Sequence, residues 1–245
     1  MAAGVTTPIL VADCVGKRYG DRWVLRSASL RAQPGQLRAL VGRNGVGKST
    51  LLRIAAGLLI PDTGTVHFAG RPRLPARLHR LAREGLFLLP DHDLLSSAFT
   101  LREHLELVRP AHVRSVEPEV VESLHLADLL EARPPELSSG ERRRAEVAVA
   151  WMRQPNCLLA DEPLRNIAPI DAELVLEVLR RIALAGCAVV VTGHEVPALM
   201  AAVHHVTWCT EGATYELGPP FMARNDERFR AMYLRDGGAG QRAEG

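Results

Sequence analysis

One nine-residue stretch constrains this chain more than any other: Gly42 to Thr50 reads GRNGVGKST. A strand-like apolar run, Leu37 to Val41, precedes it, and a helix-like pattern follows from about Lys48. Glycines at this spacing let successive backbone N–H groups turn inward around an anion, and the helix directs its unpaired N–H groups and positive dipole end at the same point. The stretch therefore predicts a phosphate-binding loop between a strand and a helix.

The side chains of the loop indicate a triphosphate ligand. In this pattern the lysine contacts the β- and γ-phosphates, and the hydroxyl that follows it ligates Mg²⁺. Of the 30 Lys and Arg residues only Lys17 and Lys48 are lysines, and a compact ammonium fits between phosphate oxygens where a guanidinium does not. A Gly-rich turn that holds a lysine by chance is the alternative, and the flanking strand and helix argue against it. The predicted binding residues are Gly42, Asn44, Gly45, Gly47, Lys48, Ser49 and Thr50, with Ser49 also a metal ligand.

Composition excludes several classes of protein. With 245 residues, 47% hydrophobic and 24% charged, the chain has an ordinary globular balance, which favours a folded chain over a disordered one. The formal net charge of +2, with the arginines spread along the chain, neither demands nor excludes a nucleic-acid partner, and we expect none. No apolar run reaches the roughly 20 residues that span a bilayer, and the N-terminus lacks a signal pattern, so we expect a cytoplasmic chain. The cysteines are far apart and are expected to be buried, reduced thiols: Cys14, Cys157, Cys187 and Cys209.

The order of strand and helix patterns predicts an α/β fold. Residues 1–39 contain short strands with turns, which favours a small antiparallel sheet. Strands then alternate with helices, which indicates a mostly parallel sheet with ligand groups at the carboxyl ends of its strands. Residues 92–137 look like a helical insertion, because Thr100 and Glu103 form a capping-box start for a helix. The last residues form a polar tail.

Two further segments carry side chains suited to nucleotide hydrolysis. Asp161 and Glu162 follow the apolar run CLLA, and such a pair supplies one carboxylate for the Mg²⁺ shell and one to orient or deprotonate water. Alone, the pair more often reflects turn chemistry, but a phosphate loop in the same chain favours the functional interpretation. His194 follows the run VVVTG and is either a γ-phosphate sensor or a structural residue.

Taken in order, these motifs resemble the ATP-binding subunit of ABC transporters, and the resemblance covers nearly the whole chain. Tyr19, in GKRYGDRWVL, matches the aromatic residue that stacks on adenine, and LSSGE at 137–141 matches the signature motif. CLLADEP matches the magnesium strand, with Asp161 as a metal ligand and Glu162 as the catalytic residue, and VTGH matches the switch histidine, His194.

The resemblance implies one ABC ATPase domain over residues 1–245. Its P-loop NTPase core, with an N-terminal antiparallel β subdomain, would comprise 1–91 and 138–216. Residues 92–137 would form the inserted helical subdomain, and 217–245 the C-terminal tail. "LSSGERRRAEVA" and "NDERFRAMYLRD" look like the branch of branched-chain amino-acid importer and lipopolysaccharide-transport ATPases, although Arg142 to Arg144 fit a solvated helix face equally well.

The resemblance also implies partners. Two ATP molecules would lie between two head-to-tail subunits, with Ser138 and Gly140 of one subunit at the γ-phosphate bound by the other. The pair, a homo- or heterodimer, would sit on the inner face of the cell membrane beside separate transmembrane permease subunits. Cargo and direction are not readable, because specificity lies in those membrane subunits.

Three positions depart from the family pattern. Asp91 stands where the lid loop carries glutamine, which leaves it as a candidate metal ligand. Ala168 replaces an aspartate, and Ser139 replaces a signature glycine. Two alternatives to an active transporter ATPase follow. One is a catalytically weak ATP-binding partner in a heteromeric transporter. The other is a soluble ABC ATPase of an assembly or DNA-related machine, against which the short chain argues because most of those carry coiled coils or tandem ATPase domains.

Overall fold

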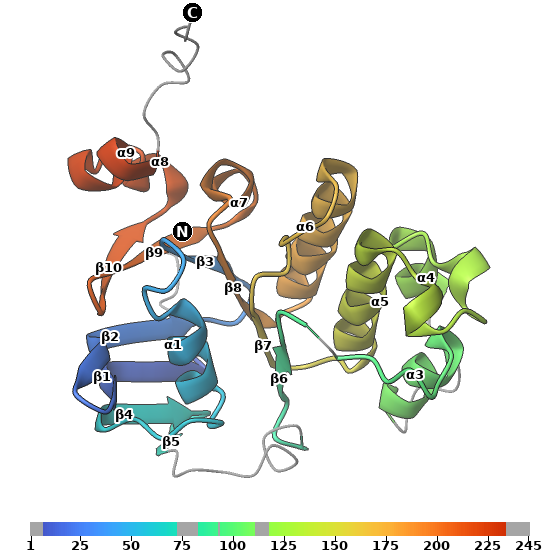
Figure 1. Cartoon of the computed structure of the whole chain (residues 1–245), viewed down its shortest axis with the longest axis horizontal. Helices are drawn as coiled ribbons and strands as arrows, with labels where there is room; N and C mark the ends of the chain where they lie inside the picture. Colours follow the sequence, from blue (N-terminus) through green and yellow to red (C-terminus); the bar gives the residue numbers. More distant parts are fainter. Residues whose placement is uncertain (1–6, 73–82, 93, 111–117, 234–245) are drawn as a thin grey trace, which may run out of the picture.

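The computed structural model describes residues 7–72, 83–92, 94–110 and 118–233 (Figure 1). Over these residues the strands form one sheet in the order β5-β4-β1-β2-β10-β9-β3-β8-β7-β6. The strands are β1 (Leu10–Tyr19), β2 (Arg22–Ala32), β3 (Leu37–Val41), β4 (Thr63–Phe68), β5 (Arg71–Pro72), β6 (Leu86–Leu89), β7 (Cys157–Ala160), β8 (Ala188–Gly193), β9 (His205–Thr210) and β10 (Ala213–Gly218).

Helices cover the sheet and build the insertion on its right in Figure 1. The helices are α1 (Lys48–Ala55), α3 (Leu101–Val108), α4 (Pro118–Ser123), α5 (Ser139–Met152), α6 (Pro169–Leu184), α7 (Val196–Ala202), α8 (Pro220–Ala223) and α9 (Glu227–Tyr233). Two short 3₁₀ helices, Ala127–Leu129 and Pro134–Glu136, connect α4 to α5.

The strands that carry the predicted motifs are parallel. β3 pairs in parallel with β8 and β9, and β7 pairs in parallel with β8 and β6. Every residue of β3, β7 and β8 is buried, which explains why these strands are nearly continuous apolar runs in the sequence. Alternate side chains of β3 enter two cores: Leu37 and Val41 pack with α5, α6 and α7, and Leu40 packs with α1. The predicted α/β class is confirmed.

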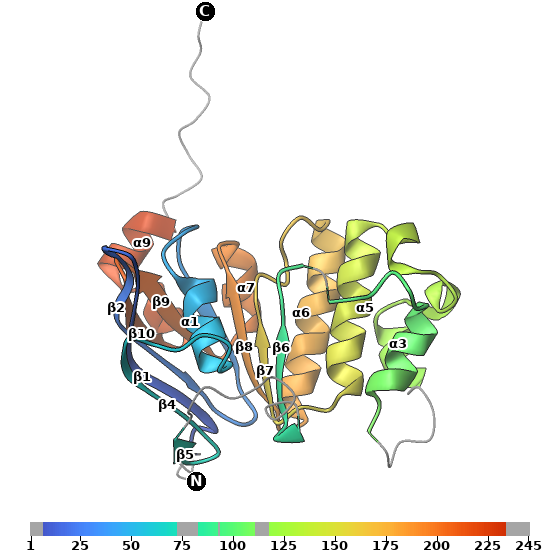
Figure 2. The ribbon, with the colours of Figure 1, turned by 60° about the horizontal axis from the view of Figure 1, so that its bottom comes forward.

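The N-terminal strands form the antiparallel sheet expected from the sequence. β1 pairs antiparallel with both β2 and β4, and their apolar faces share a core with α1. Figure 2 shows α1 between these strands and β8. The helix that follows the phosphate loop is therefore held from two sides.

Capping boxes fix the beginnings of two helices, as the sequence predicts for α3. The Thr100 hydroxyl accepts a hydrogen bond from the Glu103 N–H (3.3 Å), and the Glu103 carboxylate accepts one from the Thr100 N–H (2.7 Å). Ser138 and Glu141 form the same reciprocal pair at α5.

The arginine triplet on α5 is not a solvated helix face, which corrects that interpretation of the sequence. Arg143 is 6% exposed, and its guanidinium lies 2.9 Å from the Glu146 carboxylate. Arg144 pairs with Asp171 of α6 at 2.9 Å. A long side chain can pass over a helix surface to reach such partners, so a charge run alone does not reveal burial.

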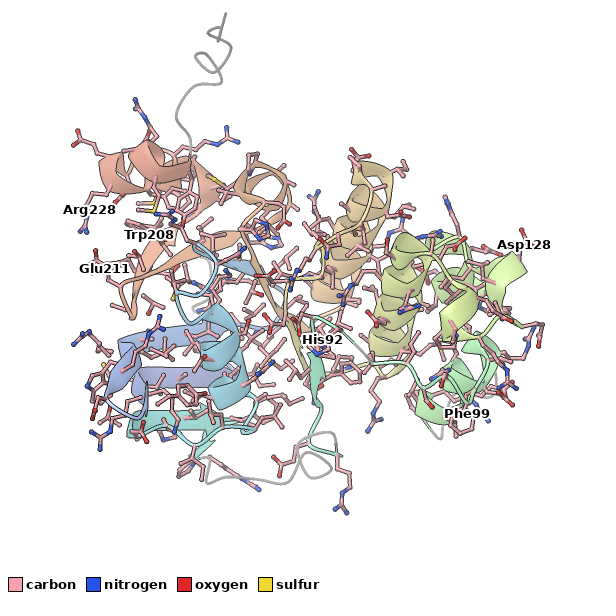
Figure 3. The ribbon with its side chains drawn as sticks, in the orientation of Figure 1. His92, Phe99, Asp128, Trp208, Glu211 and Arg228 are labelled. Carbon is pink, nitrogen blue, oxygen red and sulfur yellow. The ribbon has the colours of Figure 1, made fainter. Side chains whose placement is uncertain are left out.

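The segment after β10 is also more ordered than a polar tail, because α8 and α9 pack on the sheet. Phe229 of α9 is fully buried, and its ring lies edge-on to Trp208 of β9 with centroids 5.8 Å apart. The Arg228 guanidinium lies 5.8 Å from the centroids of the Trp208 and Tyr215 rings. Figure 3 shows Arg228 beside Trp208. One buried aromatic residue in a short polar segment gives too weak a periodic signal to predict these helices. Residues 234–245 of the tail lie outside the described residues.

All four cysteines are free, as expected, but Cys14 is exposed on β1. Burial raises the pKa of Cys187 to about 12 and that of Cys209 to about 11, so these thiols stay protonated at neutral pH. In the described part of the chain, no helix is both long and apolar enough to cross a bilayer.

Candidate functional site

The phosphate loop connects β3 to α1, and its path requires glycine for two different reasons. Gly47 caps α1 with φ of 106°, a left-handed conformation that side chains disfavour. A Cβ on Gly42 would lie 2.4 Å from the carbonyl oxygen of Cys209 in β9. The tip of the loop, residues 43–45, is exposed, so its backbone is open to an anion from solvent.

Lys48 lies inside this loop. Its side chain is nearly fully buried, and Nζ donates to the carbonyl oxygens of Gly42 (2.9 Å) and Arg43 (3.2 Å). Nζ also lies 3.5 Å from Oε1 of Glu162. A buried ammonium needs such partners, and phosphate oxygens are equivalent acceptors.

The side chain of Ser49, in the first turn of α1, contacts that of Asp161, which directly follows β7. The Ser49 hydroxyl donates to Oδ1 of Asp161 (3.0 Å), and the Thr192 hydroxyl donates to the same oxygen (2.7 Å). Asp161 is 3% exposed. Oxygen donors of this kind suit Mg²⁺, which binds one or two protein groups together with phosphate oxygens and water. The described residues hold no cluster of three or more His, Cys, Asp or Glu side chains that could bind a metal without such outside ligands.

Thr192 is a site residue that the sequence analysis missed. Its hydroxyl also accepts a hydrogen bond from the backbone N–H of Glu162 (2.8 Å), so one side chain of β8 fixes both acidic residues after β7. The available signal was a polar residue in an otherwise apolar strand, AVVVTG, where burial requires a hydrogen-bond partner.

Glu162 and His194, the two predicted catalytic residues, lie together. Oε2 of Glu162 is 3.9 Å from Nδ1 of His194, and the Glu162 side chain is 12% exposed. The backbone of Glu162 has φ of 45°, a left-handed conformation uncommon for a residue with a side chain. Strain of this kind clusters at functional sites, and here it aims the carboxylate at Lys48 and His194.

Asp91 follows β6, and its carboxylate does not join the pair of Ser49 and Asp161. Oδ1 lies 2.7 Å from Nδ1 of His92, and Oδ2 lies 3.6 Å from Nη1 of Arg165. Figure 3 shows His92 near the end of β6, on the side of α5. Among the described residues, the Asp91 carboxylate therefore faces an imidazole and a guanidinium rather than the predicted metal ligands.

Tyr19 ends β1, and its side chain is 53% exposed. The ammonium of Lys17 lies 6.0 Å from the centroid of its ring. No contact recorded for the described residues joins Tyr19 to the phosphate loop, so its predicted role depends on a ligand that would bridge the two.

The signature residues begin α5, away from the phosphate loop. Figures 1 and 2 both place α5 on the opposite side of β6, β7 and β8 from α1. Ser138 is exposed, and its hydroxyl and N–H hold the pKa of the Glu141 carboxyl below its usual range. Gly140 is buried, and a Cβ there would lie 2.0 Å from Oδ2 of Asp171. Because Gly140 has no side chain, α5 and α6 of the same chain can pack closely at this point.

Comparisons with known proteins show which family the chain belongs to. The family model for ABC transporter matches residues 25–165. The chain is 33% identical over 214 residues to the Nod factor export ATP-binding protein I of Paraburkholderia xenovorans, with 85% of this chain and 70% of that protein aligned. It is 30% identical over 234 residues to the lipopolysaccharide export system ATP-binding protein LptB of Acidithiobacillus ferridurans, with 93% and 97% aligned. It spans 58% of the Nod factor export ATP-binding protein I of Rhizobium etli, at 36% identity.

Solved structures show the same fold. A nucleotide-free ATP-binding cassette from an ABC transporter superposes with a TM-score of 0.80 at 21% identity, over 94% of this chain and all of that one. The cassette of an ABC transporter in its ADP conformation gives the same score and coverage. The chain belongs to the ABC transporter family, as one of its ATP-binding, ATP-hydrolysing cassettes.

Proposed function

We propose that this ATPase uses Mg²⁺ and works as half of a head-to-tail dimer that drives separate transmembrane subunits. The observation that carries the proposal is the convergence of Lys48, Asp161 and Glu162 at one loop, while Ser138 points to solvent elsewhere. One chain therefore presents one nucleotide-binding surface and one separate signature surface, which is the arrangement that two copies need to enclose two nucleotides.

Each residue at the loop has a proposed role. Ser49 and Asp161 would hold Mg²⁺, which neutralises charge on the phosphates when bound. Lys48 contacts the β- and γ-phosphates in place of the loop carbonyls that it now meets. Glu162 orients the attacking water and accepts its proton, and His194 contacts the γ-phosphate. Tyr19 stacks on adenine through its exposed ring.

The remaining assignments extend to partners and location. Ser138, with the start of α5, faces the nucleotide bound by a second subunit, identical or related. The cassette, a single domain with its helical insertion at 92–137, lies at the inner face of the cell membrane on permease subunits. The names of the three relatives given above describe export, which supports export as the direction.

The metal assignment is tested by binding ATP with and without Mg²⁺ in three forms of the chain. Wild type and Ser49→Thr keep the hydroxyl that meets Asp161, so Mg²⁺ should tighten ATP binding in both. Ser49→Ala should lose most of this effect while still binding ATP through Lys48. An equal response to Mg²⁺ in Ser49→Ala would contradict the site.

A second candidate function is a catalytically weak partner in a heteromeric transporter. The departures at Asp91 and Ala168 favour it, since Ala168 offers no side-chain hydrogen bond where α6 begins. Phosphate release by the purified wild-type chain at saturating ATP distinguishes an active ATPase from a catalytically weak partner. Turnover well above that of Lys48→Ala supports the main proposal, and ATP binding without turnover supports the second.

A further inference from the structure

We propose that Arg165 is a positioning residue that links Asp91 to Glu162, so that Asp91 acts on hydrolysis through this arginine and not as a metal ligand. The inference rests on the proposed function, because it concerns the same site. It replaces the expectation that the Asp91 carboxylate joins the Mg²⁺ shell, and it assigns a role to a side chain that the motifs leave unexplained.

The first observation is the position of Arg165 in the turn after β7. Its backbone N–H donates to the carbonyl oxygen of Glu162 (3.1 Å), so both side chains leave the same tight turn. Its Nε lies 3.9 Å from Oε2 of Glu162, and its Nη1 lies 3.6 Å from Oδ2 of Asp91. One guanidinium thus faces both carboxylates.

The second observation is the set of nitrogen-bearing side chains around each carboxylate. Asp91 faces His92 and Arg165. Glu162 faces Lys48, His194 and Arg165. Arg165 is the only one of these side chains that contacts both carboxylates among the described residues, and its charge does not depend on pH. Without Arg165, the Asp91 carboxylate would face only the His92 imidazole among the ion pairs of the described residues, with no permanent positive charge beside it.

The third observation is that hydrogen bonds from Arg143 hold the backbone at Asp91 in place. Arg143 of α5 donates to the carbonyl oxygens of Pro90 (2.9 Å) and Asp91 (2.5 Å). Arg143 is itself buried and paired with Glu146. The side chain of Arg165 is 51% exposed, and an exposed arginine holds one rotamer only where a partner restrains it. Asp91 supplies that restraint, and the restrained guanidinium then limits the orientations of Glu162.

A double-mutant cycle on ATP turnover tests this link. We expect Arg165→Ala and Asp91→Asn each to lower kcat about fivefold to tenfold, with the KM for ATP changed less than about twofold, because Glu162 loses its orientation while Lys48 still binds phosphate. The double variant should be no slower than Arg165→Ala alone. Arg165→Lys should recover part of the loss. Arg180→Ala, which removes an exposed arginine of α6, is the matched control and should match wild type.

Two results would overturn the inference while leaving the proposed function intact. One is a double variant whose loss equals the product of the two single losses, since independent residues multiply. The other is Arg165→Ala with the turnover of Arg180→Ala.

ATP binding with and without Mg²⁺ gives a readout besides turnover. Asp91→Asn should keep the full Mg²⁺ effect that Ser49→Ala loses, and loss of that effect in Asp91→Asn would make Asp91 a metal ligand and overturn the inference. Failure of the proposed function is recognised separately: Ser49→Ala would then respond to Mg²⁺ as wild type does, a result that the Arg165 contacts do not influence.

Discussion

The phosphate-loop region and the start of α5 carry the two most specific motifs of this chain, yet they are built differently. Around the loop, Lys48, Asp161 and Glu162 contact one another or the loop through side-chain atoms, and all three are buried or nearly so. At the start of α5, Ser138 caps its own helix and Gly140 admits Asp171. The first region gathers charged side chains at one loop, as the proposed nucleotide site requires, whereas the start of α5 contacts only its own chain among the described residues. In the proposed dimer, a second copy would bring the nucleotide that the start of α5 meets.

The largest expected effect comes from Glu162→Gln, which keeps the shape of the side chain and removes the base. Turnover should fall at least about 100-fold, while ATP binding stays close to that of wild type. Phosphate release and a nucleotide titration on the same preparation measure the two. Glu211→Gln, at an exposed glutamate in the β9–β10 turn (Figure 3), is the control that should keep wild-type turnover. Comparable turnover in both variants would place the base elsewhere.

Lys48→Ala should weaken ATP binding by at least about 2 kcal/mol, or about 30-fold, because it removes a charge-assisted contact with phosphate. A fluorescent ATP analogue measures the affinity. Lys17→Ala removes the only other lysine, which pairs with Asp62 at 3.2 Å, and should have a small effect. Equal losses would show that net charge, and not the loop contact, determines affinity.

Ser139→Glu changes the start of α5 and leaves the phosphate loop of the same chain intact, so it tests the two regions separately. Ser139 is exposed in the first turn of α5. An acidic side chain there interacts favourably with the positive end of the helix dipole, so the stability of the fold should not fall. In a head-to-tail dimer the same charge faces the partner's triphosphate, and turnover should fall about tenfold or more through repulsion. ATP affinity of the single chain should be unchanged. The neutral Ser139→Gln is the matched control. Equal turnover in both variants would show that the start of α5 does not face the partner's nucleotide.

The smallest effect concerns stability. Ala168 occupies the N-cap of α6 without a side-chain hydrogen bond, so Ala168→Asp should stabilise the chain by about 1 kcal/mol. Thermal unfolding should show a Tm rise of about 2–4 °C. Ala168→Gln, whose longer side chain is a poor cap, should not stabilise. A rise with Gln and none with Asp would mean that capping is not the cause.

Local patterns in the sequence predicted the local features of this structure. The phosphate loop, the capping box at Thr100 and the buried strand before Asp161 each need only neighbouring residues to form. Contacts between distant segments were not predictable in this way. Thr192 meets Asp161 because β7 and β8 are adjacent in register, and Arg165 meets Asp91 because β6 is the next strand. Short helices held by one buried residue, such as α9 with Phe229, also lack a periodic signal.

The central claim is that two copies enclose ATP, and the mass of Glu162→Gln in solution tests it most directly. Light scattering during size-exclusion chromatography should give about twice the chain mass of 26.8 kDa with ATP and Mg²⁺, because bound ATP is no longer hydrolysed. Without nucleotide, and in Glu162→Gln with Ser139→Glu, it should give the mass of one chain. A single-chain mass for Glu162→Gln at every protein concentration, with ATP shown to be bound, would contradict the account.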